Sequence, residues 1–347
     1  YQVVAGTLGG TSSESTVATV TTPANAAALP TAGMRLRLRA DAGVQTDGYG
    51  NVSEWSDQSG IGNNAIQTDA GSRPTLIPAA MNGFPIVRFQ NKQLLLSNVM
   101  AGATAGEVFV VLRAANTVAP GVPYFNGYSL WRFSAENAPT GSGGFFPDTG
   151  GNIIEDFGRS SPVSFVNPSS PIDQPVLYNV VSSATEWTAR LNAVVAYTTS
   201  SNTVGFRSAP VLGASQGFYS SGFQGDIAEI IIYDHSLMES ERRSVVGYLT
   251  KKYALLISLP TPPTTPTNFA GVALSSTKVA LSWGGSSNQN YNVERSLDGI
   301  TWQAIANLNG NTSYTDTGLI AATPYSYRVK AVNDGGDTGF VGPVTAV

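Results

Sequence analysis

The chain has 347 residues, of which only 12% are charged; its formal net charge is −4 and it contains no cysteine. This length exceeds what one hydrophobic core usually organises and predicts a large and a small domain. The lack of cysteine excludes disulfides, thiolate zinc sites and a cysteine nucleophile. No basic run is longer than Lys251-Lys252 and no apolar run reaches a membrane span, so neither nucleic-acid binding nor membrane insertion is expected.

Residues 1–33 are a low-complexity segment of Ala, Thr, Ser, Val and Gly that contains two strand-like runs, 3–8 and 16–21. Alone, these runs cannot bury a core. Composition favours a flexible leader. The alternative is an exchanged strand that adds to the open sheet edge of a neighbouring subunit.

The sequence pattern of residues 34–257 predicts a multi-stranded β-sandwich with one helix at its C-terminal end. Leu36 and Leu38 alternate with arginines, and Gly, Asn, Asp and Pro clusters separate further apolar runs, as a β-sandwich requires. After Tyr233, Ser236 and Glu239 offer a capping box, and apolar residues then recur at steps of three and four. We expect this helix to lie against the sandwich.

A Pro/Thr-rich stretch, 258–266, can form neither a central strand nor a helix and predicts an extended interdomain linker. The last 81 residues, 267–347, are long enough for a seven-stranded sandwich and carry its turn spacing. Asp298-Gly299 marks one hairpin turn.

Three segments of the first domain resemble the bacterial laminin-G-like, concanavalin-A-like family: Leu-Arg-Ala-Asp-Ala-Gly-Val at 38–44, Trp-Ser-Asp-Gln-Ser-Gly-Ile-Gly-Asn-Asn-Ala at 55–65, and Gly-Asp-Ile-Ala-Glu-Ile-Ile-Ile-Tyr-Asp at 225–234. The resemblance implies an all-β jelly-roll sandwich with one C-terminal helix. It also implies an extracellular or cell-surface location in a secreted bacterial protein. Function varies in this family, which includes sugar-binding modules, adhesin parts and spacers.

The second domain resembles the fibronectin type III family. Trp283 follows Val-Ala-Leu-Ser, Tyr-Asn-Val-Glu-Arg at 291–295 gives a middle strand, and Tyr-Ser-Tyr-Arg-Val-Lys-Ala at 325–331 gives the strand of the tyrosine corner. The resemblance assigns Tyr325 to that corner and Trp283 to the core. Such domains act as spacers or adhesive links.

The sequence favours a protein that is not an enzyme. A Ser-His-Asp arrangement would have to use His235, the single histidine, which reads as a surface residue. The Glu-x-Asp-x-x-Glu strand of glucan-cleaving relatives of this jelly roll is absent. Asp226 and Glu229 are three apart on a predicted strand and should point to opposite faces unless a bulge intervenes.

The loop from Asp57 to Asn64 holds a carboxylate, two glycines and two asparagines within eight residues, a composition that suits calcium. Relatives of this fold can join such a loop to an acid on the Gly-x-Ile-x-Glu strand. The resemblance therefore implies Asp57, Asn63 and Glu229 as ligands of a structural Ca2+. The alternative is a turn in which Asp57 and Ser59 bond the local backbone.

A sugar site needs an aromatic platform beside polar groups, and the loops that carry Tyr124, Tyr128 and Phe146 have that composition. We expect a non-catalytic extracellular binding or adhesion module. The jelly roll would recognise a polysaccharide or cell-surface protein, and the fibronectin domain would be a spacer. The alternative is a self-assembling fibre or surface-layer subunit, a homo-oligomer joined through residues 1–33.

Overall fold

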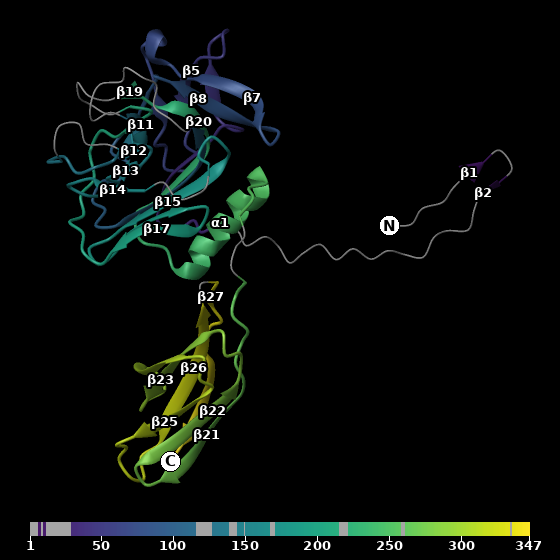
Figure 1. Cartoon of the computed structure of the whole chain (residues 1–347), viewed down its shortest axis with the longest axis vertical. Coiled ribbons are helices and arrows are strands. Elements are labelled where there is room, and N and C mark those ends of the chain that lie inside the picture. Colours follow the sequence, from purple (N-terminus) through teal and green to yellow (C-terminus); the bar gives the residue numbers. More distant parts are fainter. Residues whose placement is uncertain are drawn as a thin grey trace.

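The computed structural model describes residues 29–115, 127–138, 144–148, 150–166, 171–214, 221–257, 261–333 and 335–347, together with the paired strands β1 (Gly6–Thr7) and β2 (Gly10–Thr11). The regular secondary structure of these residues is almost entirely β-strand, with one α-helix, α1 (Glu239–Tyr253), after the last strand of the first domain (Figure 1). The predicted all-β class is confirmed. Most of the predicted N-terminal segment lies outside the described residues.

The first domain contains two sheets. The eight-stranded sheet has the order β17-β16-β15-β10-β20-β8-β7, with β3 also paired to β20. Its strands are β3 (Met34–Arg39), β7 (Thr75–Met81), β8 (Phe84–Gln90), β10 (Gly106–Ala114), β15 (Val176–Ser182), β16 (Trp187–Leu191), β17 (Val194–Thr199) and β20 (Gln224–Tyr233). The second sheet has ten short strands, in the order β14-β13-β12-β11-β18-β9-β6-β5-β4, with β19 on β11. These are β4 (Val44–Thr46), β5 (Val52–Trp55), β6 (Ala65–Ile66), β9 (Leu94–Leu95), β11 (Gly127–Arg132), β12 (Gly144–Asp148), β13 (Ile153–Glu155), β14 (Val163–Phe165), β18 (Val211–Leu212) and β19 (Ser221–Gly222), and a 3-10 turn, Ala70–Ser72, precedes β7.

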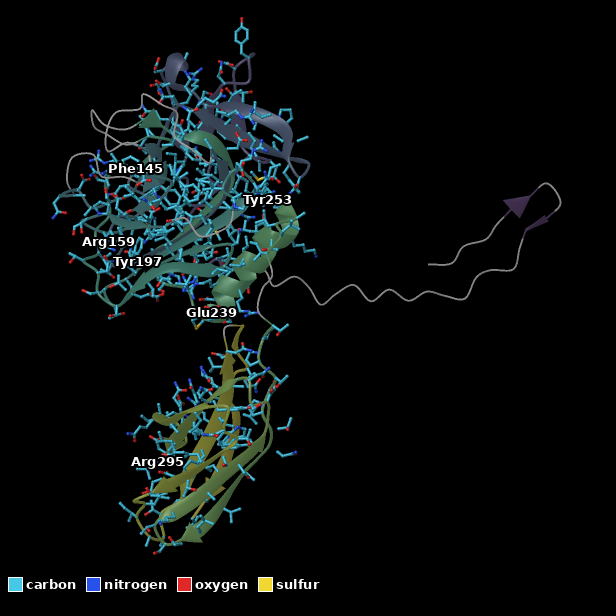
Figure 2. The ribbon with its side chains drawn as sticks, viewed as in Figure 1. Phe145, Arg159, Tyr197, Glu239, Tyr253 and Arg295 are labelled. Carbon is cyan, nitrogen blue, oxygen red and sulfur yellow. The ribbon has the colours of Figure 1, made fainter. Side chains whose placement is uncertain are left out.

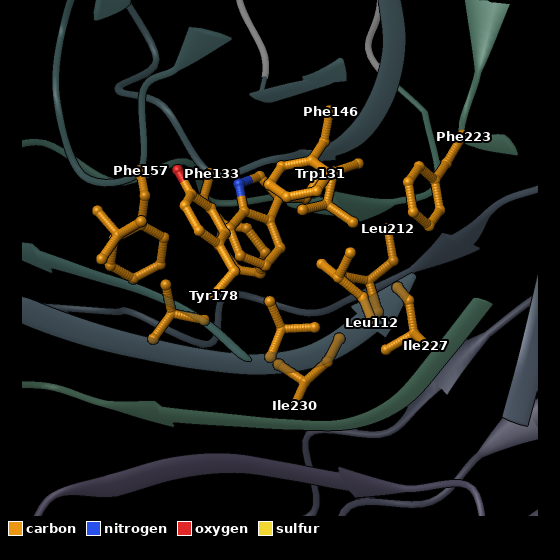
Figure 3. Close-up of a cluster of buried hydrophobic side chains, with 14 of the residues drawn as sticks. Leu112, Trp131, Phe133, Phe146, Phe157, Tyr178, Leu212, Phe223, Ile227 and Ile230 are labelled. Atoms are coloured by element: carbon orange, nitrogen blue, oxygen red, sulfur yellow. The ribbon is translucent and has the colours of Figure 1, made fainter. Parts of the chain in front are cut away.

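The main core lies between the two sheets. Figure 3 shows aromatic side chains such as Trp131 and Tyr178 packed over Leu112 and Ile230 of the eight-stranded sheet. The rings of Trp131 and Tyr178 are stacked, with centroids 6.1 Å apart. This burial of large apolar side chains is the dominant stabilising contribution to the domain, which has no disulfide.

The central strand β10 is buried on both faces. Val108, Val110 and Leu112 face the main core, whereas Phe109 and Val111 face the outer side of the sheet, where α1 packs. A strand buried on both faces is apolar throughout rather than alternating, which explains the run Val-Phe-Val-Val-Leu. The helix therefore covers apolar surface that the eight-stranded sheet would otherwise expose to water.

The helix is held by an ion pair beneath it. Arg242, on its first turns, donates from Nε to Glu107 Oε1 at 2.7 Å and from Nη2 to Glu107 Oε2 at 3.1 Å; Glu107 is fully buried. The predicted start of the helix is wrong by a few residues: Met238 precedes the first turn, and its N–H donates to Glu241 Oε2 at 3.0 Å. Ser236 does not cap the helix.

The second domain has two sheets, ordered β21-β22-β25 and β24-β23-β26-β27, with β28 on β26. Trp283, Tyr291 and Tyr327 are buried between them. The Tyr325 hydroxyl accepts from the Ile320 N–H at 3.3 Å, which is the contact expected of a tyrosine corner. The strands are β21 (Thr267–Ser275), β22 (Lys278–Gly284), β23 (Asn290–Ser296), β24 (Gln303–Asn309), β25 (Ser313–Thr317), β26 (Tyr325–Asn333), β27 (Gly336–Asp337) and β28 (Val341–Ala346).

The helix α1 meets the second domain at β27, which lies next to it (Figure 1). Figure 2 shows Glu239 at the end of the helix nearer the second domain and Tyr253 at the other end. In the described part of the chain, no helix is long and apolar enough to cross a membrane.

The buried pair between α1 and the sheet yields a stability prediction. The substitution Arg242→Met leaves Glu107 buried without its cation, and we expect the free energy of unfolding to fall by about 3 kcal/mol. Urea denaturation followed by circular dichroism measures this change. Lys251→Met, on the exposed side of the same helix, should change the free energy by less than about 0.5 kcal/mol. Equal effects of the two substitutions would contradict the assigned role of the pair.

Candidate functional site

Two of the three residues predicted to form an aromatic platform are buried. Phe146 is 1% exposed and its ring lies 5.1 Å from that of Tyr178 in the main core, and Tyr128 is only 7% exposed. Tyr124 lies outside the described residues. The prediction is wrong for Tyr128 and Phe146 because both side chains come from strands of the ten-stranded sheet and face inward. A buried ring cannot stack on a sugar.

The Asp57 carboxylate is saturated by hydrogen bonds from the chain itself. Its Oδ1 accepts from the N–H groups of Arg37 and Ser59 at 2.8 and 2.9 Å. Its Oδ2 accepts from Ser59 Oγ at 2.6 Å and from the N–H groups of Gly62 and Asn63 at 3.1 and 3.0 Å. These contacts match the turn interpretation of the loop, in which the carboxylate orders the backbone.

Glu229, the third predicted calcium ligand, is used elsewhere. It is fully buried beneath α1 and accepts from Arg37 Nε at 3.0 Å, Lys252 Nζ at 2.8 Å and Tyr253 Oη at 3.0 Å. The structure therefore brings Asp57 and Asn63 together but gives Glu229 to a separate ion-pair cluster. No three acidic or histidine side chains are grouped as a metal site among the residues that the structure describes. Calcium binding stays a prediction of the sequence.

The hydrogen bonding of Asp57 predicts that calcium has little effect on stability. A ligand that binds only the folded state raises the midpoint of thermal unfolding, but here binding would first have to displace five protein donors. We expect midpoints in millimolar calcium and in chelator to agree within about 1 °C. A calcium-dependent rise of several degrees that Asp57→Asn abolishes would show instead that the loop is a metal site.

Asp226 and Glu229 point to the same face of the sheet, contrary to the prediction. The pairing of β10 with β20 shifts register between Val111 and Leu112, so that Ala228 is an extra residue. This β-bulge turns both acids to the outer face. Asp226 pairs with Arg88 and Arg113, whereas Glu229 pairs with cations of β3 and α1. Each acid is thus neutralised by its own pair of cations.

Asp226 lies in a hollow of about 290 Å³ on the outer face, which we name the polar hollow. Arg88 donates to both Asp226 oxygens at 2.7 and 3.0 Å, and Arg113 donates to Oδ2 at 2.6 Å. The amides of Gln90 and Gln224 line the same hollow. Planar donors and acceptors held in fixed positions are suited to directed hydrogen bonds with a polar ligand. The sequence signal that could have revealed this site is the presence of polar residues, such as Arg88, Arg113 and Asp226, in otherwise apolar strands.

A larger hollow of about 590 Å³ lies on the same face, where the sheet ends at β17; we name it the helix-side groove. Its floor is a row of cross-strand neighbours, Asn179, Arg190 and Val195. Its walls come from α1 and from Asn333 of the second domain. The full lining is Leu177, Asn179, Arg190, Ala193, Val194, Val195, Glu239, Arg242, Arg243, Val246 and Asn333.

Two adjacent acids, Glu155 and Asp156, are buried at the end of β13. Glu155 Oε1 accepts from Trp131 Nε1 at 3.0 Å and from the N–H groups of Asp156 and Phe157. Neither oxygen of Asp156 has a hydrogen-bond partner in the described part of the chain, although its side chain is fully buried. An ionised carboxylate in such a place is costly.

Burial, with the adjacent Glu155 as the second cause, raises the pKa of Asp156 to about 8. The guanidinium groups of Arg132 and Arg207 oppose this rise without cancelling it. Burial also raises the pKa of Glu155 above its usual range, and the hydrogen bond from Trp131 opposes that rise. Asp156 is therefore a neutral acid at neutral pH in the folded protein.

The buried acid predicts a stability that declines as pH rises. In the unfolded chain Asp156 has an ordinary pKa near 3.8, so between about pH 4 and pH 8 the folded state binds more protons than the unfolded state. We expect the free energy of unfolding to fall by about 2–4 kcal/mol from pH 5 to pH 8. In Asp156→Asn this decline should be smaller. Parallel pH profiles for the two proteins would contradict the assignment.

The second domain matches a known family. The family model of the fibronectin type III domain matches residues 264–347, and the core tryptophan and tyrosine corner described above lie in that range. Residues 264–347 are a fibronectin type III domain. The laminin-G-like assignment of the first domain stays a prediction.

Three curated bacterial relatives match stretches of the length of this fibronectin type III domain. They are Exoglucanase B of Cellulomonas fimi (37% identical over 83 residues, 22% of this chain and 7% of the relative), Chitinase 63 of Streptomyces plicatus (42% over 84 residues, 23% and 12%) and the poly(3-hydroxybutyrate) depolymerase of Ralstonia pickettii (45% over 69 residues, 20% and 13%). The chain thus matches about a tenth of the length of each relative.

Two solved structures are similar to parts of the chain. An Fn3-like protein from Clostridium thermocellum is 34% identical, with a TM-score of 0.22, and the match covers 24% of this chain and 90% of that protein. A Trypanosoma rangeli sialidase is 13% identical with a TM-score of 0.45, and the match covers 65% of this chain and 34% of that enzyme. At that score the second similarity carries no argument about function.

Proposed function

We propose that the chain is a non-catalytic, polysaccharide-binding part of a secreted bacterial protein, in which the first domain binds the glycan and the fibronectin type III domain is a spacer. The observation that carries this proposal is the fibronectin type III match, which relatives named as an exoglucanase and a chitinase share over a small part of their length. A part shared by enzymes with different names is a module separate from their chemistry.

The chemistry of the acidic residues supports a non-catalytic role. A glycosidase needs one carboxyl group that stays protonated and another that attacks or activates water, both facing the scissile bond. On the outer face, Asp226 is bound by two arginines, and Glu229 is bound by Arg37 and Lys252 beneath the helix. Asp156 has the pKa of an acid catalyst but is fully buried.

We assign glycan binding to the polar hollow. Sugar hydroxyl groups are bound by planar side chains that donate and accept at fixed angles, and the hollow presents two guanidinium groups, two amides and two carboxylates. The ion pairs to Asp226 hold Arg88 and Arg113 in place before a ligand arrives. Such preorganisation lowers the entropic cost of binding.

The amides of the polar hollow provide a test that leaves the ion pairs intact. In a pull-down with insoluble cellulose and chitin, we expect the full chain to bind at least one polymer. Gln90→Ala with Gln224→Ala should bind about tenfold more weakly, because two hydrogen bonds are lost at about 0.5–1.5 kcal/mol each.

Gln303→Ala, at an exposed position of the fibronectin type III domain, is the matched control and should bind like the parent chain. Assays of the same mixtures for reducing ends should show no release. Equal binding by the double variant would refute the assigned site, and release of sugar would refute the non-catalytic role.

A further inference from the structure

The strand β17 is an edge strand that carries neither charge nor proline. It lies at the end of the eight-stranded sheet and pairs only with β16 among the described residues. Its sequence, Val-Val-Ala-Tyr-Thr-Thr, has no charge and no proline, and Val194 and Val195 are 63% and 52% exposed. Edge strands are normally blunted by charges, prolines or bulges. A register shift leaves Ala196 as an extra residue in β17, so that Val194 and Val195 lie on one side of the irregularity and Tyr197 to Thr199 on the other. At the opposite edge, β7 contains Pro78 as well as an irregular register.

The helix-side groove adjoins this edge. Its floor runs across three strands through Asn179, Arg190 and Val195 and reaches the edge itself, and α1 walls it with Val246 and Arg243. A strand added beside β17 would bond to the free backbone of the edge. Every second side chain of that strand would point to the groove side of the sheet. A free edge beside a groove is the arrangement used in recognition by strand addition.

We propose that β17 and the helix-side groove bind residues 16–21 of a second copy of the chain as an added strand. The sequence Thr-Val-Ala-Thr-Val-Thr is uncharged, has high β-propensity and carries only small side chains on both faces. Side chains of this size can pack against the apolar members of the groove lining, such as Val195 and Val246. The segment precedes the described part of the first domain, which begins at Leu29.

The position of Leu29 favours a second copy over the same chain. Leu29 packs with the cluster beneath α1, and the carbonyl of the next residue, Pro30, accepts from the Tyr233 hydroxyl of β20 at 3.0 Å. Along the sheet, β20 lies four strand spacings from β17, which is about 19 Å. Residues 22–28 could span this distance only along a nearly straight path, and α1 covers the outer face of the strands between. A neighbouring subunit meets no such restriction.

This inference is independent of glycan binding. The polar hollow is built on β8, β10 and β20, whereas the groove is built on β15, β16 and β17. The two hollows share no lining residue. Failure of either proposal therefore says nothing against the other.

Disulfide trapping tests the proposed pairing, because the natural chain contains no cysteine. Full-length chains carrying Val195→Cys are mixed with chains carrying Val17→Cys, Ala18→Cys or Thr19→Cys and are then oxidised. Paired strands bring cysteines on the same face within bonding distance. Because side chains alternate along a strand, we expect Val195→Cys to form heterodimers either with the variants at Val17 and Thr19 or with the variant at Ala18, but not with all three. The control is Ile300→Cys, at the tip of a hairpin in the second domain, where the Ile300 side chain is 84% exposed.

Light scattering gives the second measurement. The full chain should have a mass at least twice that of the 36.2 kDa monomer, and deletion of residues 1–21 or the substitution Val195→Lys should restore the monomer. Ile300→Lys should leave the assembly intact, and circular dichroism should be the same for all variants. A monomeric full chain, an assembly that survives Val195→Lys, or cross-linking without alternation would overturn the proposal.

Discussion

The structure of the first domain depends on covering the outer face of its eight-stranded sheet. The central strands β10 and β20 are apolar on both sides, because one side faces the main core and the other faces α1. Without the helix, residues such as Phe109 and Ile231 would face water. The helix therefore belongs to the core of the domain, although it follows the last strand in the sequence.

The buried charges of this domain follow from the same constraint. The helix crosses the sheet above two acids, Glu107 and Glu229, and places a cation on each, Arg242 and Lys252. These pairs fix where the helix lies along the sheet, since a shift by one turn would leave buried charges unpaired. The helix covers only the middle of the face, so that the polar hollow and the helix-side groove are left on either side of it.

Much of the fold could be predicted from the sequence. The alternation of Leu36 and Leu38 with arginines, the helical spacing after Tyr233 and the aromatic residues of the second domain rest on local periodicity, which the structure preserves. The arginines that alternate with these leucines pair with Asp234, Glu229 and Asp41. Such patterns need only the residues of one element.

The candidate site was harder to predict because it depends on non-local geometry. The bulge at Ala228 cannot be read from the spacing of Asp226 and Glu229, although it decides which face they share. The burial of Tyr128 and Phe146 follows from the direction in which their strands face, which composition does not give. The protonated state of Asp156 requires knowing that its neighbours exclude water. In each of these cases tertiary packing overrides the local sequence pattern.

The contacts of Glu229 have a mechanical consequence. The chain leaves the first domain through the residues after Tyr253, so that tension between a surface held by the first domain and whatever follows the second would be applied to the last turn of α1. Lys252 and Tyr253 fasten that turn to the centre of the sheet through Glu229. Force that pulls on the end of the helix must break this anchor before the helix can peel away. The sheet, rather than the helix, therefore bears the load.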